Sequence, residues 1–247
     1  MKIAAFSDVH SNVFALKAVI SDIEQNGADV MLNLGDIFYG PIAPRATYEV
    51  LDKHKIVTIR GNQDRQIYEA TAEEVESNPT MGFVLDELGQ QPLDWMKTIP
   101  SGKQLTGDIY LCHGSPANDL VYLLEDISTG HPRLRTDSQI TELLSGQPSE
   151  IILCGHTHTA RTVSLESGQL IVNPGSVGLP AYTDDVPVAH SMESFSPHAS
   201  YVMLEKSSAG WLVEQRKVPY DFQLAAKECL DRGRSDWAHF LTTGRGL

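Results

Sequence analysis

The feature that most constrains this chain is a repeated pattern in which a short apolar segment runs directly into a cluster of polar residues. The pattern occurs five times, at residues 2–6, 30–34, 56–59, 109–112 and 151–154. Short apolar runs bounded by turn residues are typical of buried strands. Because ligands of open α/β sheets bind at the carboxyl ends of the strands, the polar clusters predict one binding site assembled from several strand ends.

Amphipathic segments separate the first three of these predicted strands. A helix with one apolar face is predicted over residues 12–25, with Gly27 as its stop signal. A second helix is predicted to begin at Pro44 and to run to about residue 53. The order strand, helix, strand, helix, strand indicates a parallel α/β unit at the start of the chain.

The rest of the chain changes character twice. Residues 65–100 are predicted to form a small helical cap with breaks at Gly89 and Pro92, inserted in a single domain that spans residues 1–247. The later part is β-rich, with an irregular loop at 183–198, four strands and a last helix predicted at 162–165, 169–172, 201–205, 211–218 and 222–231. This order predicts an α/β (α+β) fold: a four-layer αββα sandwich of two mixed sheets flanked by helices.

Composition excludes several classes of protein. Hydrophobic residues make up 41% of the chain and charged residues 21%, which is ordinary for a soluble globular protein. No stretch approaches the roughly 18 apolar residues of a membrane helix, and the apolar run at the N-terminus is too short for a signal peptide. The three cysteines are widely spaced and form no CxxC motif. We therefore expect a cytoplasmic protein with reduced thiols and no membrane partner.

The charge of the chain bears on its partners. The net charge is −13, and lysines and arginines never form a run. Proteins that grip long nucleic acid by its backbone usually carry a basic stripe. We therefore expect a small substrate rather than long nucleic acid, and the oligomeric state is left open.

Seven side chains in the polar clusters are suited to metal binding: Asp8, His10, Asp36, Asn62, His113, His156 and His158. Residues two apart after a strand point the same way, so each of the D-x-H and H-T-H pairs can converge on one place. Carboxylate, imidazole and amide ligands together suit divalent metals such as Mn, Fe, Ni or Zn. The absence of thiolate ligands argues against a structural zinc cluster.

The ordered blocks D-x-H, GD, GN-x-D, HG and GHTH between Asp8 and His158 resemble the signature of the calcineurin-like metallophosphoesterase superfamily. Within it, the chain is most similar to the small bacterial and archaeal phosphodiesterase branch, whose members are often called diadenosine tetraphosphatase-like. The segments that carry this closer resemblance are SDVHSN (7–12), GDIFYGP (35–41), NPGSVGLP (173–180) and VPYD (218–221).

The resemblance implies a division of labour around two divalent transition-metal ions, with Mn expected and Fe, Ni or Zn as alternatives. The first ion is implied to bind Asp8, His10, Asp36 and His158, and the second Asp36, Asn62, His113 and His156. Asp36, which is implied to bridge the two ions, and Asn62 are therefore predicted to be catalytic as well as metal-binding. A metal-bridging hydroxide would attack phosphorus in line, and Asp64 is implied to steady the site from behind the ligands.

One position departs from the family pattern. The usual block is G-N-H-[DE], whose histidine contacts phosphate or protonates the leaving oxygen, but this chain has Gln63 there. Glutamine donates a hydrogen bond but gives up no proton near neutral pH. We therefore predict that Gln63 binds the substrate and contributes to catalysis by positioning it. We expect the loss of hydrolysis rate to be smallest for substrates with good leaving groups.

Three further residues have two interpretations each. Asn12 is either the N-cap of the first helix or a substrate-binding residue near the phosphate, and the two roles are compatible. Ser176, in a turn after a strand, is predicted to line the substrate site. Arg65 is predicted to form a salt bridge rather than to meet a phosphate.

The remaining histidines and two of the cysteines have simpler interpretations. Cys112 and Cys154 precede metal-site segments and are predicted to be buried structural thiols. The histidines without a strand-end context are predicted to be surface or loop residues: His54, His131, His190, His198 and His239.

The function predicted from these residues is that of a dinuclear metal-dependent phosphoesterase, preferably a phosphodiesterase or nucleoside-polyphosphate hydrolase acting on a small phosphodiester or nucleotide. One alternative is a phosphomonoesterase or phosphoprotein phosphatase, which the glutamine at position 63 makes weaker. The other is a non-catalytic binding scaffold of the same fold. A complete ligand set argues against a scaffold, because protein binding alone gives no reason to keep seven metal-binding side chains.

Overall fold

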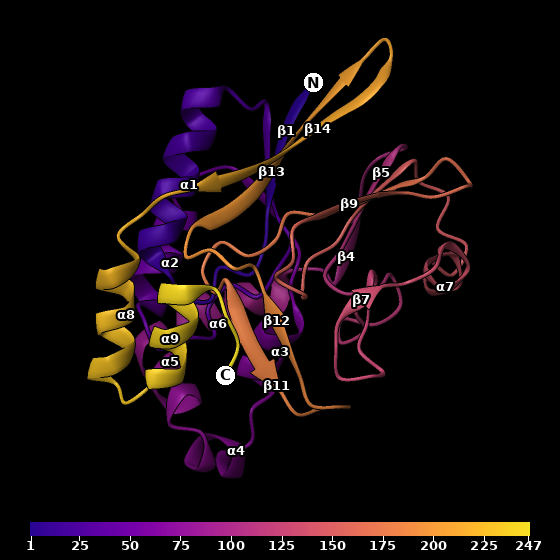
Figure 1. Cartoon of the computed structure of the whole chain (residues 1–247). Helices are drawn as coiled ribbons and strands as arrows, with labels where there is room; N and C mark the ends of the chain where they lie inside the picture. The colour runs from indigo at the N-terminus through magenta and orange to yellow at the C-terminus, as the bar shows by residue number, and fades with distance from the viewer.

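The computed structural model describes residues 1–247 and contains two five-stranded mixed sheets (Figure 1). The first sheet has the order β14-β13-β1-β2-β3, with strands Gly210–Val218, Ala199–Ser207, Lys2–Phe6, Val30–Asn33 and Ile56–Thr58. The second has the order β4-β5-β8-β10-β9, with strands Gly102–Thr106, Ile109–Cys112, Ile151–Leu153, Leu170–Asn173 and Arg161–Ser164. Each sheet contains three adjacent parallel strands: β1, β2 and β3 at one side of the first sheet, and β5, β8 and β10 in the middle of the second. The other pairings are antiparallel.

Helices lie on the outer faces of the two sheets (Figure 1). They are α1 (Val13–Asn26), α2 (Pro44–Leu51), α3 (Asn62–Glu69), α4 (Ala72–Ser77), α5 (Pro79–Leu88), α6 (Gln90–Thr98), α7 (Asp137–Leu143), α8 (Phe222–Asp231) and α9 (Ser235–Thr243). Two small hairpins complete the fold: β6 (Glu125–Asp126) with β7 (Arg133–Leu134), and β11 (Ala181–Asp184) with β12 (His190–Glu193). None of the helices combines the length and the apolar character needed to span a membrane.

The layers follow from the alternation of side chains along each strand. In β1, Ile3 and Ala5 face the core between the two sheets, whereas Ala4 and Phe6 face the core beneath the helices. Successive strand residues point to opposite faces, so a strand that is buried on both faces must be apolar throughout. The second sheet repeats the pattern: Ile151 faces the other sheet and Ile152 faces the α7 side. The predicted sandwich of two mixed sheets between helices is confirmed.

Residues 65–100 are helical, as predicted, and belong to α3 through α6. Their apolar side chains, including Val84 and Met96, join the same core cluster as Phe6 of β1. The predicted break at Pro92 is wrong, because Pro92 lies inside α6. It occupies the first turn of that helix, where backbone N–H groups have no helical acceptor and a proline therefore loses no hydrogen bond.

The prediction of an irregular loop at residues 183–198 is also wrong. This segment contributes to the antiparallel hairpin of β11 and β12, in which Thr183 pairs with Ser191. The two strands pair only with each other, and because the segment is rich in polar residues and contains Pro187, its sequence shows no strand pattern. The sequence pattern did not predict α7, α9, β4, β6 and β7, whereas α8 has the predicted bounds.

Candidate metal centre

The residues that follow the parallel strands of both sheets meet at one edge of the sandwich. Backbone hydrogen bonds join the loops directly: the Asp8 N–H donates to the Gly35 carbonyl at 2.9 Å, and the Gly155 N–H donates to the His113 carbonyl at 2.7 Å. The His156 N–H donates to the Asp8 carboxylate at 3.2 Å, which links the two sheets. The loops that carry Asp8, His113 and His156 are therefore held against their neighbours by main-chain hydrogen bonds.

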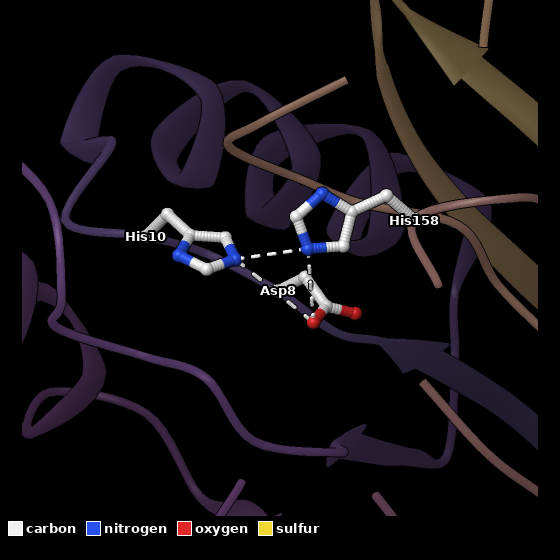
Figure 2. A group of neighbouring side chains, drawn as sticks. All are labelled: Asp8, His10 and His158. Carbon is white, nitrogen blue, oxygen red and sulfur yellow. Dashed lines mark hydrogen bonds and ion pairs between the residues drawn. The ribbon is translucent and has the colours of Figure 1, made fainter. Parts of the chain in front are cut away.

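The first group of candidate ligands is Asp8, His10 and His158 (Figure 2). The Nε2 atoms of the two imidazoles lie 3.0 Å apart, and Asp8 Oδ1 lies 3.4 Å from His158 Nε2 and 4.0 Å from His10 Nε2. Two nitrogens that bind one cation at about 2.1 Å and at right angles are themselves about 3.0 Å apart. The three side chains therefore already have the spacing of ligands to a shared ion.

The second group is Asp36, His113 and His156. His113 Nε2 lies 3.3 Å from Asp36 Oδ2 and 4.0 Å from Asp8 Oδ1, so it stands between the carboxylates of the two groups. The other oxygen of Asp36 accepts a hydrogen bond from the Gln63 N–H at 2.9 Å. The structure brings together all six charged or imidazole residues that the sequence predicted as ligands.

Several ligand atoms are buried without any hydrogen-bond partner in the protein. They include Asp8 Oδ1 and the amide oxygen Asn62 Oδ1. Leaving a buried polar atom unpaired costs about 1–3 kcal/mol or more when it is charged. Their lack of partners fits two divalent cations, which would satisfy these atoms, and the role of Asn62 as a ligand stays a prediction.

Two of the histidines are oriented by their other ring nitrogen. His10 Nδ1 lies 3.0 Å from the Tyr39 carbonyl, and His113 Nδ1 lies 2.8 Å from the Leu34 carbonyl. A carbonyl only accepts hydrogen bonds, so each Nδ1 carries the proton when the imidazole is neutral. This arrangement leaves an Nε2 lone pair directed at the site, which is the state a metal ligand needs.

The electrostatics of the site divide the histidines. Burial, reinforced by His158, lowers the pKa of His10 to about 4, and burial with His113 lowers the pKa of His156 to about 4. Burial also acts to lower the pKa of His113, but the Asp36 and Asp8 carboxylates outweigh it and raise that pKa to about 10. Two of the ligands are thus held neutral, while without metal a proton on His113 compensates the buried carboxylates.

The backbone at the site is unusual. Five of the seven predicted ligands have positive φ angles, from 48° to 71°: Asp8, His10, Asp36, His156 and His158. A residue with a Cβ atom pays roughly 1–2 kcal/mol in this left-handed region. Strain of this kind persists only where surrounding contacts impose it, and it clusters at functional sites.

Two glycines allow the ligand loops to approach one another. A Cβ atom on Gly61 would lie 2.1 Å from Asp36 Oδ1, and one on Gly155 would lie 2.1 Å from Ser7 Oγ. Both distances are far below van der Waals contact. The glycines of the GN and GH blocks are therefore required by close packing behind the ligands.

Asp64 supports the site from behind, as the sequence predicted. Its carboxylate accepts hydrogen bonds of 2.9 Å from the backbone N–H groups of Asp36, Ile37 and Gly61. Burial, together with the charge of Asp36, raises the pKa of Asp64 to about 7, while the backbone donors oppose the rise. One side chain thus fixes the bridging candidate Asp36 relative to the loop that carries Asn62.

A cavity of about 710 Å³ lies over the ligands. His10, Asp36, Asn62, His156 and His158 form part of its lining, together with Gln63 from α3. The other walls come from α9, from the β11–β12 hairpin, from the segment around residues 120–127 and from the loop between β2 and α2. They include the side chains of Tyr39, Tyr122, Tyr182 and Trp237.

The aromatic wall of the cavity contacts the candidate ligands. The ring centroid of Tyr122 lies 4.7 Å from that of His156, and the ring centroid of Tyr182 lies 4.6 Å from that of His158. Sequence reasoning missed these tyrosines, because no motif marks them and they flank or occupy short hairpin strands. The only sequence feature that could have indicated them is an aromatic residue next to a segment with a weak strand pattern.

His190 is a further correction. It is 4% exposed rather than a surface residue, and its Nε2 lies 3.0 Å from the Tyr122 hydroxyl. That hydroxyl also accepts a hydrogen bond of 2.7 Å from Tyr182. Burial of His190 was not predicted, because the sequence around it shows no strand pattern. In the hairpin it supports the aromatic wall from behind.

The predicted substrate-binding residues occupy different places. Gln63 lines the cavity, and its Oε1 atom is buried without a partner. Asn12 is fully buried; it caps α1 by accepting from the Ala15 N–H and donates to the Gly178 carbonyl. Ser176 is 2% exposed and donates to the Asp8 carbonyl. These two residues shape the ligand loops and do not line the cavity, so their contact with substrate stays a prediction.

Two other side-chain predictions have clear outcomes. Arg65 forms the predicted salt bridge, with its guanidinium 3.0 Å from Asp119 and 3.2 Å from Glu69. Cys112 and Cys154 are buried, as predicted for structural thiols. Burial raises the pKa of both thiols, so neither has thiolate character.

Comparisons with known proteins agree with this geometry. The family model of the calcineurin-like phosphoesterase superfamily domain matches residues 1–194. An uncharacterized protein of Methanocaldococcus jannaschii is 24% identical over 263 residues, covering 95% of this chain and 94% of that protein. A solved metallophosphoesterase from Sphaerobacter thermophilus superposes with a TM-score of 0.75 at 24% identity, covering 99% of both chains. A hypothetical protein from Pyrococcus horikoshii gives 0.76 at 16% identity, covering 100% of this chain and 99% of that one.

Proposed function

The chain belongs to the calcineurin-like phosphoesterase superfamily, and from that premise we propose that it is a dinuclear phosphodiesterase or nucleoside-polyphosphate hydrolase. Its membership and its two groups of candidate ligands support the broader activity of a metal-dependent phosphoesterase. The observation that carries the proposal is the convergence of Asp8, His10 and His158 with Asp36, His113 and His156 beneath one cavity.

The residues of the site fit the chemistry of phosphoryl transfer. Two divalent cations held there would activate water and offset the charge that develops on the phosphoryl oxygens. Asp36 is the candidate bridge that the family resemblance implies, and its carboxylate is held by His113 at one oxygen and by the Gln63 N–H at the other. Asn62 directs an unpaired amide oxygen into the same region. The chain thus supplies oriented ligands whose backbone is already held in place.

The preference for diesters rests on Gln63. It lines the cavity next to the candidate ligand Asn62 and offers an amide where a proton donor is usual in the family. Without a proton donor at this position, substrates that release an acidic alcohol or a phosphate are favoured over simple alkyl monoesters. A monoesterase is the alternative that this position disfavours. Manganese as the bound metal, the cytoplasmic location and the nucleotide class of substrate are parts of the proposal.

The test is a comparison of substrates on protein reconstituted with Mn²⁺. We expect Mn²⁺-dependent hydrolysis of bis-p-nitrophenyl phosphate at a higher kcat/KM than that of p-nitrophenyl phosphate. Elemental analysis should find close to two metal ions per chain. His156→Gln should remove both activity and about one metal ion, because an imidazole ligand is lost. A folded protein that binds no metal above background would contradict the proposal.

The matched control is His131→Gln, which makes the same change at an exposed histidine outside the cavity. Its activity and metal content should equal those of the wild type. A higher kcat/KM for the monoester in the wild type would instead support the phosphatase alternative.

A further inference from the structure

The cavity over the metal centre extends well beyond the candidate ligands, and two arginines line it. They are Arg135, which follows strand β7, and Arg234, which precedes α9. No lysine lines the cavity. In a chain with a net charge of −13, a cation in a substrate cavity is informative only if it is not already neutralised by a neighbouring carboxylate.

Arg234 is neutralised. Its guanidinium donates to the Asp236 carboxylate at 2.6 Å through one terminal nitrogen and at 2.9 Å through Nε, and it also bonds to Thr80. Nε and both terminal nitrogens of Arg234 thus already donate hydrogen bonds to other protein atoms. Arg234 is therefore part of the cavity wall rather than a free binding group.

Arg135 is different. Its backbone N–H donates to the Leu124 carbonyl at 2.8 Å, and its Nε donates to the Tyr122 carbonyl at 3.1 Å. Its two terminal nitrogens have no hydrogen-bond partner, and no carboxylate lies within 4.0 Å of the guanidinium. The nearby buried Glu125 is instead paired with Arg161 at 2.8 Å. Arg135 is thus held at its base while the outer edge of its guanidinium is free.

The segment that holds Arg135 also contacts the metal centre. The Tyr122 ring packs on the imidazole of His156, and the Tyr122 hydroxyl accepts from Tyr182, whose hydroxyl also lies 3.2 Å from the His156 carbonyl. Arg135 and the candidate ligand His156 therefore both contact Tyr122, the first through its carbonyl and the second through its ring. Side chains held in this way lose little conformational entropy when they bind a ligand.

We propose that Arg135 binds a second anionic group of the substrate while the reacting phosphoryl group lies at the metal centre. This inference rests on the proposed function and narrows its substrate class. It favours phosphoanhydrides, in which a second phosphate follows the reacting one, over isolated phosphodiesters. The reason is that a free guanidinium edge presents paired N–H donors that match the oxygens of a phosphate.

The test measures binding to the Mn²⁺-loaded protein by isothermal titration calorimetry. The probes are adenosine 5′-monophosphate and the α,β-methylene analogue of adenosine 5′-diphosphate, in which a P–C–P bridge replaces the hydrolysable anhydride and adds one second phosphoryl group. We expect the analogue to bind wild-type protein at least tenfold more tightly, since one charge-assisted hydrogen-bond pair gives about 10- to 100-fold in affinity. Arg135→Ala should remove most of this gain, and Arg135→Lys should keep only part of it, because an ammonium group lacks the planar fork.

The matched control is Arg133→Ala on the same small hairpin, where the arginine is 61% exposed, pairs with Asp126 and lies outside the cavity. This variant should keep the full gain. An equal gain in the wild type and in Arg135→Ala would overturn the inference, as would a wild type that binds the two probes equally or binds neither. The proposed function fails separately, through absence of Mn²⁺-dependent hydrolysis of bis-p-nitrophenyl phosphate by the wild type.

Discussion

Individual ligand residues show that the site is built at a cost to stability. Asp8 and Asp36 are buried carboxylates with positive φ angles, and Asn62 Oδ1 is buried without a hydrogen-bond partner. Each of these features is unfavourable in a protein without bound cations. Bound cations would offset the buried charges and give the unpaired oxygens a partner, whereas the backbone strain is present with or without them. The buried charges and unpaired oxygens of the individual ligand residues are therefore the strongest indication of a metal centre.

Asp36 is the residue whose conservative replacement we expect to be most damaging. In Asp36→Asn the amide keeps the size of the side chain but cannot bridge two cations as a carboxylate does. Turnover of bis-p-nitrophenyl phosphate should fall by at least about 10²-fold, and the metal content should fall with it. The control is Asp86→Asn, the same change at an exposed position of α5. Turnover near that of the wild type in Asp36→Asn would refute its role as the bridge.

Gln63 makes a separate prediction about the leaving group. If Gln63 supplies no proton, rates for a series of aryl diesters should fall steeply as the pKa of the leaving phenol rises. Gln63→His should flatten this dependence and raise the activity on monoesters. Gln66→His, one turn later on α3 and also lining the cavity, tests whether the effect needs position 63. A flat dependence in the wild type would mean that another group protonates the leaving oxygen.

At the scale of elements, the parallel strands explain what could be predicted and what could not. Strands such as β1 and β8 are apolar on both faces and end in polar blocks. Their positions in the sequence, and the candidate ligands that follow them, could therefore be predicted. The hairpin β11–β12 has no such apolar run and pairs with no other strand. Tyr182 and Arg135 lie on or beside hairpins of this kind, and only the folded structure brings them to the cavity.

The close approach of two strand-end loops predicts the effect of one methyl group. In Gly61→Ala the new Cβ atom would lie 2.1 Å from Asp36 Oδ1 and 2.5 Å from the Asp36 backbone nitrogen, so the loops must separate. Overpacking of this kind typically costs about 1–3 kcal/mol of the free energy of unfolding. Denaturant unfolding should show that loss, and metal content should fall too, because the loop carries Asn62.

The control for this change is Gly107→Ala, where a Cβ atom has no neighbour within 4 Å. It should leave both the free energy of unfolding and the metal content unchanged. If Gly61→Ala binds two metal ions with wild-type stability, the close contact between these loops is not a requirement of the site.

The whole molecule is organised around the contact between its two sheets. Ile3 and Leu32 from the first sheet meet Leu111 and Ile151 from the second in one apolar core. The same packing brings the carboxyl ends of both sets of parallel strands to one edge, so each metal-binding group combines residues from both sheets. Binding at the site is therefore coupled to the packing of the entire sandwich.

This coupling predicts that metal binding stabilises the whole protein. A ligand that binds only the folded state adds about 2.7 kcal/mol at a concentration 100 times its Kd, and each kcal/mol raises the Tm of a protein of this size by roughly 2–4 °C. We therefore expect Mn²⁺ to raise the Tm of the wild type by about 5–10 °C per saturated site, and a chelator to reverse the rise. His158→Ala should reduce the rise, since one candidate metal ligand is gone. His131→Ala, at an exposed position, should show the full rise. If calorimetry finds the same Tm with Mn²⁺ and with chelator in the wild type, the two sheets are not joined by metal at this edge.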